Sequence, residues 1–487
     1  MLAGVQAVGP RVGSDDATST STRQTIGVVL AAVAYCFTLR WMYEHVIAPE
    51  YTYLKYAYRS PDPRAFGLAL VLVLVLALLL PRRIGRPSHF IVWVLFLVAV
   101  VPSIVIPQIS PALDTGQALT LACWVSGSFA LVAVAGTRRL LRDFVPRPSC
   151  DPRTFWLVLV VATVIADIYV AVAIGFRLEL PSLTDVYGLR AEFNGTEADD
   201  AVLAYLGPTL FNVVHPLILV RGLWTRRWVW VLGGAAGQFL VYSASGNKTA
   251  VLAPAALILV TLAFRLGRRL TGTIILVSGT VVSITMFLVD QLIDSDAAVS
   301  LIVRRLLVTP GLLSAGYVSV FSDLDKVHLS HSVLSPFLRY PYPAEPPDLV
   351  GAVFFGDPDT HANANIFADG YANFGYPGMV LACAVLVLIL WTVDDATEGL
   401  PLGASSMMFL LLGLALGDGS VFTSILSGGF LAALVLAAVL PRDGWTARSR
   451  RGKTSSDSAP DHEDADKRSS SEASFLDHRR ESPNVGM

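Results

Sequence analysis

The sequence contains little charge for its length. Only 15% of its 487 residues are Asp, Glu, Lys or Arg, whereas 54% are hydrophobic, and the mean hydropathy is +0.58. A soluble domain normally carries about a quarter charged residues. The composition therefore excludes an ordinary soluble protein. The formal net charge of −2 gives no sign of a nucleic-acid partner, and we expect none.

Cysteine is also scarce. Of the four cysteines, Cys36, Cys123 and Cys383 fall inside apolar runs, and Cys150 falls in a basic segment. No C-x-x-C spacing occurs, so the sequence predicts neither a disulfide framework nor a zinc site. No internal repeat is evident, which argues against a transporter built from inverted repeats. The first apolar run is long and follows a polar leader, so we expect no cleavable signal peptide.

What the sequence has instead is a series of apolar runs of about 17–25 residues, long enough to cross the hydrocarbon core as helices. They are continuous rather than alternating, which excludes a transmembrane β-barrel. The sequence predicts an all-α polytopic membrane protein with about twelve transmembrane helices. The expected spans are 25–43, 65–80, 88–106, 116–135, 154–176, 201–220, 227–243, 249–264, 272–288, 374–393, 403–416 (short enough to be re-entrant) and 422–440.

Arginines concentrate in every second short loop. The positive-inside rule places these loops in the cytoplasm. With twelve spans, both termini are then cytoplasmic, in a multi-pass protein of the plasma membrane. The acidic segment "DDATEGL" at 394–400 must lie on the same side, although acidic residues count little in this rule. The arginines in question are Arg82, Arg83, Arg86, Arg138, Arg139, Arg142, Arg147, Arg221, Arg226, Arg227, Arg265, Arg268 and Arg269.

The chain divides into three parts by composition. Residues 1–24 and 441–487 are polar, and we expect both to be disordered cytoplasmic segments. Residues 25–440 form the transmembrane domain. Within it, two long segments, 177–200 and 290–373, are predicted to face outward, the second as one large loop between spans nine and ten. Long loops in compact domains are often functional.

Both outward segments carry cations among apolar residues. Tyr187 and Arg190 are three residues apart, which places them on one face of a helix. Arg304 and Arg305 interrupt an apolar, amphipathic stretch. Burying an arginine costs about 2.5–3.5 kcal/mol at the centre of a membrane helix. An anionic ligand would offset this cost, or the side chains could extend to lipid phosphates. Arg339 follows in "FLRYPYP".

The segment "HANANIFADGYANFGYPG" precedes the tenth predicted span. His361, Asn363, Asn365, Asp369 and Tyr371 supply hydrogen-bonding groups and a flat aromatic face, which is the usual chemistry for holding sugar rings. The alternative is ordinary helix capping combined with an interfacial aromatic belt. Composition alone does not decide between these interpretations.

Four short stretches resemble, in order, the oligosaccharide repeat-unit polymerases (Wzy-type O-antigen polymerases). They are "DVYGLRAEF", "SGNKTAVLAP", "RRLLVTPGLLSAGYVSVFS" and "NANIFADGYANFGYPG", which together extend from about Asp185 to Met379. The resemblance implies a membrane-embedded glycosyltransferase that joins undecaprenyl-pyrophosphate-linked units on the outer face of the plasma membrane. It implies no metal and no nucleotide cofactor. A flippase, a chain-length regulator and membrane lipids are the expected partners.

The resemblance also implies roles for particular residues. Arg190 and Arg304 or Arg305 are expected to bind the pyrophosphate, and Lys248 stands where relatives often have arginine, keeping the charge without the bidentate fork. Independently of the resemblance, a departing pyrophosphate gains charge that arginines can stabilise. The acceptor hydroxyl needs a base. His361 and Asp369 are the preferred candidates, ahead of Asp323 and His331.

Two further patterns have weaker support. The Asp-x-Asp pairs at 323–325 and 357–359 match the metal-binding pattern of nucleotide-sugar transferases, but no Rossmann-type segment accompanies them. Asp167 and His215 fall within predicted spans, where an ionisable residue is a functional candidate by default. We expect a structural role for both, because His215 precedes Pro216 and needs a polar partner, and Asp167 can pair with a neighbouring helix.

Three other functions stay open. A ligase that moves finished glycan to a different acceptor would use similar arginine chemistry. A transferase dependent on lipid-phosphate sugars usually carries acidic residues in its first outer loop, and Glu44 and Glu50 are the acids available here. A flippase or transporter would concentrate charged residues or broken helices at mid-membrane. The polar residues of this sequence concentrate instead in the predicted outer segments, which argues against transport.

Overall fold

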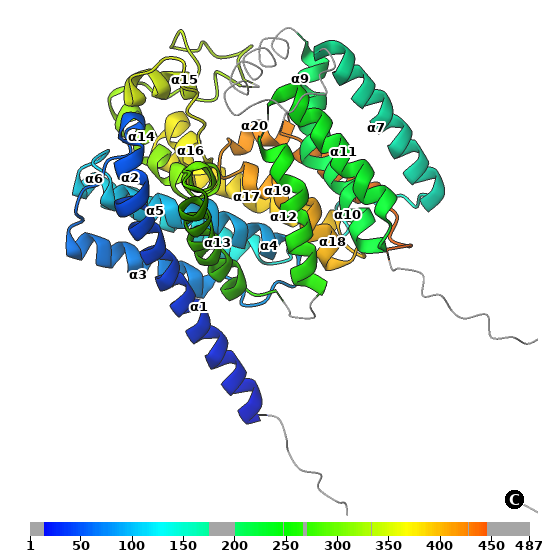
Figure 1. Ribbon diagram of the computed structural model, residues 1–487, viewed down its shortest axis with the longest axis horizontal. Helices are drawn as coiled ribbons and strands as arrows, with labels where there is room; N and C mark the ends of the chain where they lie inside the picture. Colours follow the sequence, from blue (N-terminus) through cyan, green and yellow to red (C-terminus); the bar gives the residue numbers. More distant parts are fainter. Residues whose placement is uncertain are drawn as a thin grey trace, which may run out of the picture. The chain divides into compact units, whose positions relative to one another are not determined.

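The computed structural model describes residues 14–174, 200–246, 248–265, 270–332, 334–426 and 428–445, which all belong to one compact unit (Figure 1). In the described part of the chain, helices are the only regular structure besides a single bridge between Arg83 and Thr271. The α-helices of the first half are α1 (Ser14–Met42), α2 (Ala48–Glu50), α3 (Pro63–Leu79), α4 (Pro87–Leu95), α5 (Val101–Ile109), α6 (Thr115–Leu131), α7 (Pro152–Ile174), α9 (Ala201–Thr209), α10 (His215–Thr225) and α11 (Trp228–Ser245).

The second half continues the same architecture. Its α-helices are α12 (Lys248–Arg265), α13 (Gly272–Ile293), α14 (Thr309–Asp323), α15 (Pro346–Val350), α16 (Ile366–Phe374), α17 (Tyr376–Ala396), α18 (Leu402–Met408), α19 (Leu410–Ala415), α20 (Val421–Leu426) and α21 (Phe430–Val439). Wider π-helical turns join or extend several of them, and a short 3₁₀ turn, η2 (Thr52–Leu54), follows α2. The π-helical segments are η1 (Tyr43–Ile47), η3 (Phe96–Val100), η4 (Val132–Gly136), η5 (Leu210–Val214), η6 (Val299–Val308) and η7 (Gly351–Phe355).

Eight helices of the described residues are long and apolar enough to cross a membrane, so the fold is that of a polytopic membrane protein. Seven of them coincide with predicted spans. The eighth, Val299–Asp323, lies inside the segment predicted to be one large outer loop. The predicted spans that lack such a counterpart correspond to shorter or less apolar helices. The eight are Thr22–Glu50, Pro87–Ile109, Thr115–Gly136, Pro152–Ile174, Val202–Thr225, Gly272–Ile293, Val299–Asp323 and Tyr376–Ala396.

The arginine-rich loops meet at one end of the bundle, which we call the arginine-rich end. Ile84 N donates to Leu270 O at 3.1 Å, and Arg265 donates to the carbonyl of Leu223, so three of the loops are joined directly. Arg139 and Arg147, from the fourth loop, both contact the Glu398 carboxylate.

The acidic segment 394–400 is held by the arginine-rich loops. Asp394 accepts hydrogen bonds from Ser88 N at 3.0 Å and from Arg86 at 3.2 Å. The hydrogen bonds from Arg139 and Arg147 lower the pKa of Glu398 to about 2. The acids of "DDATEGL" thus pair with the cations around them, which explains how an acidic loop can share a face with basic ones.

The helix Val299–Asp323 begins and ends away from the arginine-rich end. The Asp290 carboxylate, near the far end of α13, accepts from Ala298 N at 2.9 Å and from Val299 N at 2.7 Å. After α14, Val327 N donates to Ala372 O at 3.0 Å, just before α17 begins. Since α13 starts and α17 ends at the arginine-rich end, the chain between them starts and finishes at the opposite end.

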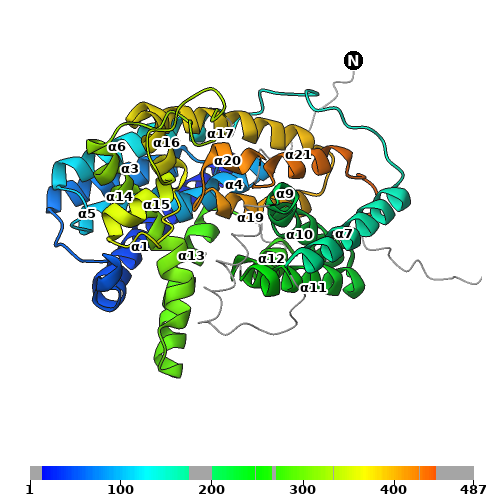
Figure 2. The ribbon, with the colours of Figure 1, turned by 90° about the horizontal axis from the view of Figure 1, so that it is seen from above.

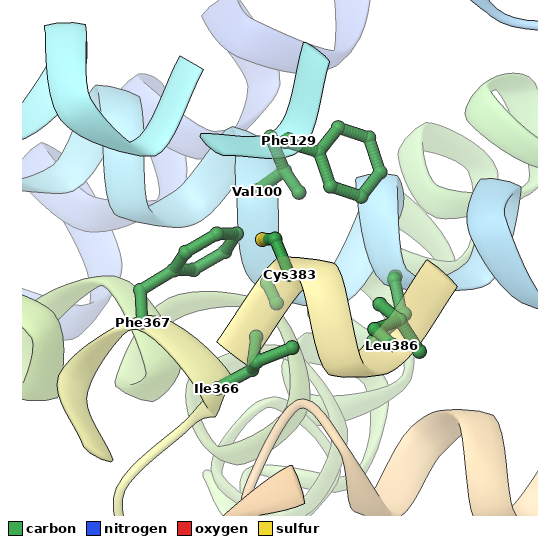
Figure 3. A pocket seen from close by; sticks show the side chains of 8 residues that line it. Val100, Phe129, Ile366, Phe367, Cys383 and Leu386 are labelled. Carbon is green, nitrogen blue, oxygen red and sulfur yellow. The ribbon is translucent and has the colours of Figure 1, made fainter. Parts of the chain in front are cut away.

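Helix α16 enters the bundle and turns back. It lies beside α17, and Gly370 and Gly378 bring the two backbones into direct contact (Figure 2). At the other end of α16, Ile366 and Phe367 line a small void together with Cys383 and Leu386 of α17, and this contact region has no room for a water molecule (Figure 3). This contact lies about 10–15 Å along the axis of α17. Segment 356–365 therefore descends into the bundle, and α16 returns, as in a re-entrant hairpin.

The close contact between α16 and α17 requires glycine. A Cβ on Gly378 would lie 1.8 Å from the Gly370 carbonyl oxygen, which is backbone and cannot rotate away. We expect Gly378→Ala to lower the free energy of unfolding by about 1–3 kcal/mol or more, as overpacking does. The measurement is the thermal unfolding midpoint of the detergent-purified chain. Gly67→Ala is the matched control, because nothing lies within 4 Å of its Cβ and alanine favours a helix interior. Equal midpoints for the two variants would contradict the hairpin.

Helices α7, α9, α10 and α11 form a separate hydrophobic cluster beside the main core (Figure 1). The Asp167 carboxylate on α7 lies 3.0 Å from His215 Nε2 on α10, and the His215 side chain is only 1% exposed. This pair ties α7 to α10 and matches the structural role expected from the sequence. His215 also packs directly on Gly237 of α11, where a Cβ would lie 2.5 Å from the ring.

Candidate functional site

A groove of ≈ 660 Å³ runs between α1 and α13 on the surface of the bundle. Its walls are mostly apolar, with a single ion pair between Arg40 and Glu44 at 3.7 Å. The groove follows the halves of α1 and α13 that point away from the arginine-rich end. The apolar side chains that line it are Ala34, Phe37, Trp41, Met42, Ile284, Phe287 and Leu288.

Arg304 lies just beyond the ends of both helices that form the groove. Its guanidinium carbon is 4.5 Å from the centroid of the Tyr51 ring and 5.7 Å from that of Tyr56, in the segment that follows α1 and α2. Its Nη2 donates to Ser300 Oγ at 2.9 Å. Tyr51 also donates to the Asp296 carboxylate, which follows α13, at 2.7 Å. The cation is thus fixed by aromatic faces, whereas its neighbour Arg305 is exposed.

The segment bearing Arg304 is connected to the re-entrant helix by hydrogen bonds. Thr309 Oγ1 donates to the Arg304 carbonyl at 2.7 Å and pairs with the Tyr56 hydroxyl at 2.6 Å. The next residue, Pro310, accepts from Asn365 Nδ2 at 2.7 Å. Because Asn365 caps the start of α16, the position of Arg304 is mechanically tied to that of α16.

Asp369 lies in the middle of α16 and is 5% exposed. Its carboxylate accepts from Ser420 Oγ at 2.7 Å and from Asn373 Nδ2 at 3.2 Å. Burial raises the pKa of Asp369 to about 6, against the lowering effect of the hydrogen bonds from Ser420 and Asn373. A carboxylate with this pKa is ionised at neutral pH yet basic enough to accept a proton in a reaction.

The partner of Asp369 comes from a loop that also ends inside the bundle. Gly417, three residues before Ser420, packs against Val98, where a Cβ would lie 2.8 Å from the valine side chain. Val98 is near the middle of the membrane-crossing run Pro87–Ile109. The loop 416–420 and helix α16 therefore meet inside the bundle rather than at its rim.

Tyr371 packs beneath the segment that follows α14. Lys326 Nζ lies 4.7 Å from the centroid of the Tyr371 ring, and the Tyr371 and Tyr376 rings are 4.9 Å apart. The Tyr371 side chain is buried. Lys326 thus places a cation against α16, the helix that carries Asp369. The sequence alone does not single out this lysine.

His361, the other candidate base, is much more exposed to solvent than Asp369. Its Nδ1 lies 2.6 Å from the Asp348 carboxylate, and its side chain is 50% exposed. His331 is half-buried, and desolvation lowers its pKa. Arg339 is exposed and Asn363 is half-buried. Of the two preferred bases, only Asp369 is enclosed by the bundle.

Asn365, predicted to contact substrate, instead has a capping role. It is fully buried, and its Oδ1 accepts from Phe367 N and Ala368 N at the start of α16. Its Nδ2 bonds Pro310 O and Ser314 Oγ. These bonds use both hydrogens of the side-chain NH₂ group and both acceptor positions of the side-chain oxygen, which leaves no donor or acceptor for a sugar hydroxyl. The capping interpretation of the segment is correct at this residue.

Three predicted residues cannot be placed in the site. Tyr187 and Arg190 lie outside the described residues. Lys248 is the first residue of α12, and the position of its side chain is likewise outside the described part. The pyrophosphate-binding role expected of Arg190 and Lys248 therefore stays a prediction. Among the residues that the structure describes, no group of three metal-ligating side chains occurs.

Comparison with protein-family models, with curated proteins and with solved structures finds no match to this chain.

Several site residues were missed by sequence reasoning. Ser420 is 51 positions from Asp369 in the chain, and only the tertiary fold brings them together. Tyr51 and Tyr56 lie in the first predicted outer loop, of which the sequence singles out only the acids Glu44 and Glu50. The available signal was modest: the polar "GDGS" at 417–420 stands between two apolar runs, and four tyrosines cluster at 51–58.

Proposed function

We propose that the chain polymerises undecaprenyl-pyrophosphate-linked oligosaccharide repeat units at the end of the bundle opposite the arginine-rich loops. One observation carries the proposal: a fixed arginine, Arg304, lies where both helices of an apolar surface groove end. An apolar chain joined to an anionic head is the ligand that this arrangement fits. The resemblance to repeat-unit polymerases supplies the reaction.

The proposed mechanism assigns each part of the substrate to a part of the chain. The isoprenoid lies in the groove, and its pyrophosphate is bound by Arg304 and, by resemblance, by Arg190 and Lys248, whereas the exposed Arg305 is left outside the site. The acceptor hydroxyl attacks the anomeric carbon while the bond from that carbon to the pyrophosphate oxygen breaks. The electron pair of that bond leaves with the pyrophosphate, where arginine stabilises the charge. The hydroxyl proton passes to Asp369.

The ion pairs of the structure help to compare the polymerase with the three alternative functions, a lipid-phosphate-sugar transferase, a ligase and a transporter. A lipid-phosphate-sugar transferase would use acids of the first outer segment, but Glu44 is already engaged with Arg40. A ligase would share the donor half of the mechanism and differ only in the acceptor. Asp167 and His215, the two ionisable residues that the sequence places within predicted spans, pair with each other, so these two give transport no specific support.

The proposal is tested with purified chain in proteoliposomes supplied with synthetic undecaprenyl-pyrophosphate-linked units. We expect products two or more units long that stay attached to the carrier. Formation of such products from single units requires no other acceptor. Transfer only after a non-glycan acceptor is added would identify a ligase, and no transfer with either acceptor would refute the enzymatic proposal.

We also propose that the chain lies in the plasma membrane with its arginine-rich end facing the cytoplasm and with both termini on that side. Cys150 is exposed in an arginine-rich loop, and Ser335 is exposed after α14. In a Cys123→Ser, Ser335→Cys chain, a membrane-impermeant thiol reagent should label one thiol in intact cells and two after permeabilisation. The Cys123→Ser chain alone should label only after permeabilisation. Labelling of Cys150 in intact cells would invert the orientation.

A further inference from the structure

At the arginine-rich end, the guanidinium of Arg221 lies between two tryptophan rings. Its Cζ is 4.8 Å from the Trp156 centroid and 5.0 Å from that of Trp445. Trp156 belongs to the first turns of α7, Arg221 to the last turns of α10, and Trp445 to the segment after α21. Three elements distant in the sequence thus converge on one cation. Trp156 and Trp445 are 5% and 3% exposed.

Two donors at this place have no hydrogen-bond partner among the described residues. They are Arg221 Nη1 and Trp156 Nε1, and both atoms are buried. The third polar atom is accounted for, because Trp445 Nε1 donates to Pro441 O at 2.8 Å. A buried donor without a partner is costly, and more so on a charged group. Because the Arg221 guanidinium carbon lies 4.8 Å from the centroid of the Trp156 ring, the two donors belong to adjacent side chains, which is the requirement for one anion with several oxygens to accept from both.

The surrounding charges favour an anion. Arg226 and Arg227 follow α10 and are exposed, and Arg265 donates to the carbonyl of Leu223 at the same end of α10. Asp443, two residues before Trp445, is exposed, and within the described part of the chain no ion pair joins a carboxylate to Arg221. The site therefore carries an excess of positive charge.

The surface next to the site is apolar. Leu157 and Val161, which follow Trp156 on α7, are 66% and 50% exposed. Trp228 and Val229 at the start of α11 are 74% and 82% exposed. Tryptophan and arginine at the end of apolar helices are typical of the boundary between lipid tails and headgroups. An anion bound at Arg221 would thus have acyl chains alongside it.

We propose that Arg221 and Trp156 form a binding site for the phosphate of an anionic membrane phospholipid, separate from the glycan-transfer site. Arg221 and Trp156 each donate a hydrogen bond to phosphate oxygens, and the two tryptophan rings hold the guanidinium in place. The acyl chains lie along the exposed apolar side chains of α7 and α11. The site is independent of the proposed polymerase activity, because it lies at the other end of the bundle.

The test measures the thermal unfolding midpoint of the full chain in detergent as phosphatidylglycerol, diacylglycerol with the same acyl chains, or inorganic phosphate is titrated. A ligand that binds only the folded chain raises the midpoint in proportion to its affinity. We expect phosphatidylglycerol to bind at least about tenfold more tightly than diacylglycerol. Trp156→Phe, which keeps an aromatic six-membered ring beside Arg221 but removes the N–H with the five-membered part of the indole, should reduce phosphatidylglycerol affinity about tenfold, as expected for a hydrogen bond to a charged group.

Two further variants complete the design. Arg221→Gln should abolish the preference for phosphatidylglycerol over diacylglycerol, and Arg226→Gln, an equal charge change outside the tryptophan pair, should retain it. If Arg221→Gln does not fold, Trp156→Phe decides the matter alone. Wild-type affinity in Trp156→Phe would overturn the proposal. If inorganic phosphate raised the midpoint as much as phosphatidylglycerol does, the lipid would be overturned as the source of the phosphate. A response to none of the three ligands would overturn the anion site itself.

Discussion

Replacing Asp369 with asparagine is expected to lower the rate of glycan transfer about 10²–10⁴-fold, the range typical of a lost general base. Asparagine has nearly the same shape and can keep hydrogen bonds with Ser420 and Asn373, so the fold should be retained. The wild-type rate should rise with pH and reach half its maximum near pH 6, because burial raises the pKa of Asp369 to about 6. The residual rate of Asp369→Asn should lack this rise.

The same substitution should not destabilise the chain at neutral pH. Because the pKa of Asp369 is raised from 3.8 to about 6, the folded chain holds a proton between these pH values that the unfolded chain has released. Stability therefore falls as the pH rises through this interval and stays lower above it. A shift of about two pKa units corresponds to about 3 kcal/mol. Asp369→Asn should remove this pH dependence from the unfolding midpoint and raise the midpoint at neutral pH.

The two readouts separate catalysis from folding. Loss of transfer together with an unchanged or higher unfolding midpoint supports a base at Asp369. Loss of both activity and stability would indicate that Asp369 only holds α16 against the loop 416–420. His361→Asn is the comparison variant, because His361 pairs with Asp348 at an exposed position. A larger loss of rate in His361→Asn than in Asp369→Asn would transfer the role of base to His361.

Arg304→Gln is expected to lower kcat about 10²–10³-fold, as removal of one charge-stabilising donor commonly does. Arg305→Gln is the matched control, since it makes the same charge change one residue away at an exposed position. Its rate should fall far less. Arg304→Lys should be intermediate, because lysine keeps the charge but loses the planar fork that stacks on Tyr51 and bonds Ser300.

The measurement is initial rate against donor concentration in proteoliposomes. Since Arg304 is proposed to stabilise charge that develops in the transition state, the effect should fall on kcat more than on KM. Equal losses in Arg304→Gln and Arg305→Gln would contradict the arrangement described for Arg304, and a change in KM alone would reduce its role to donor binding.

The sequence predicted the spans better than the site. Long apolar runs such as Gly272–Ile293 are identifiable because their length and their apolar composition are together sufficient to indicate a membrane-crossing helix. For helix α16 the sequence predicts a loop, because its nine residues are too few and too polar to resemble a membrane span. Its burial depends on the close contact between Gly370 and Gly378. It also depends on Asn365, which caps the start of α16 and bonds the Pro310 carbonyl.

The sequence predicts a loop over the helix Val299–Asp323 for a different reason. Arg304 and Arg305 break its apolar pattern, and the stacking of Arg304 on Tyr51 and Tyr56, which makes this cation tolerable, comes from the other end of the chain. The sequence places the acidic segment 394–400 on the side of the basic loops, and its ion pairs with Arg86, Arg139 and Arg147 supply the physical reason. In each case, the polar group is satisfied by partners that are distant in the sequence, which composition and periodicity do not reveal.

The most direct measurement is the amount of undecaprenyl pyrophosphate released per glycosidic linkage formed in proteoliposomes. The proposed displacement predicts one carrier pyrophosphate for each new linkage in the wild-type chain, and a parallel fall of both quantities in Asp369→Asn and Arg304→Gln. Linkage formation without release of the carrier, or no linkage formation by a folded wild-type chain, would contradict the account.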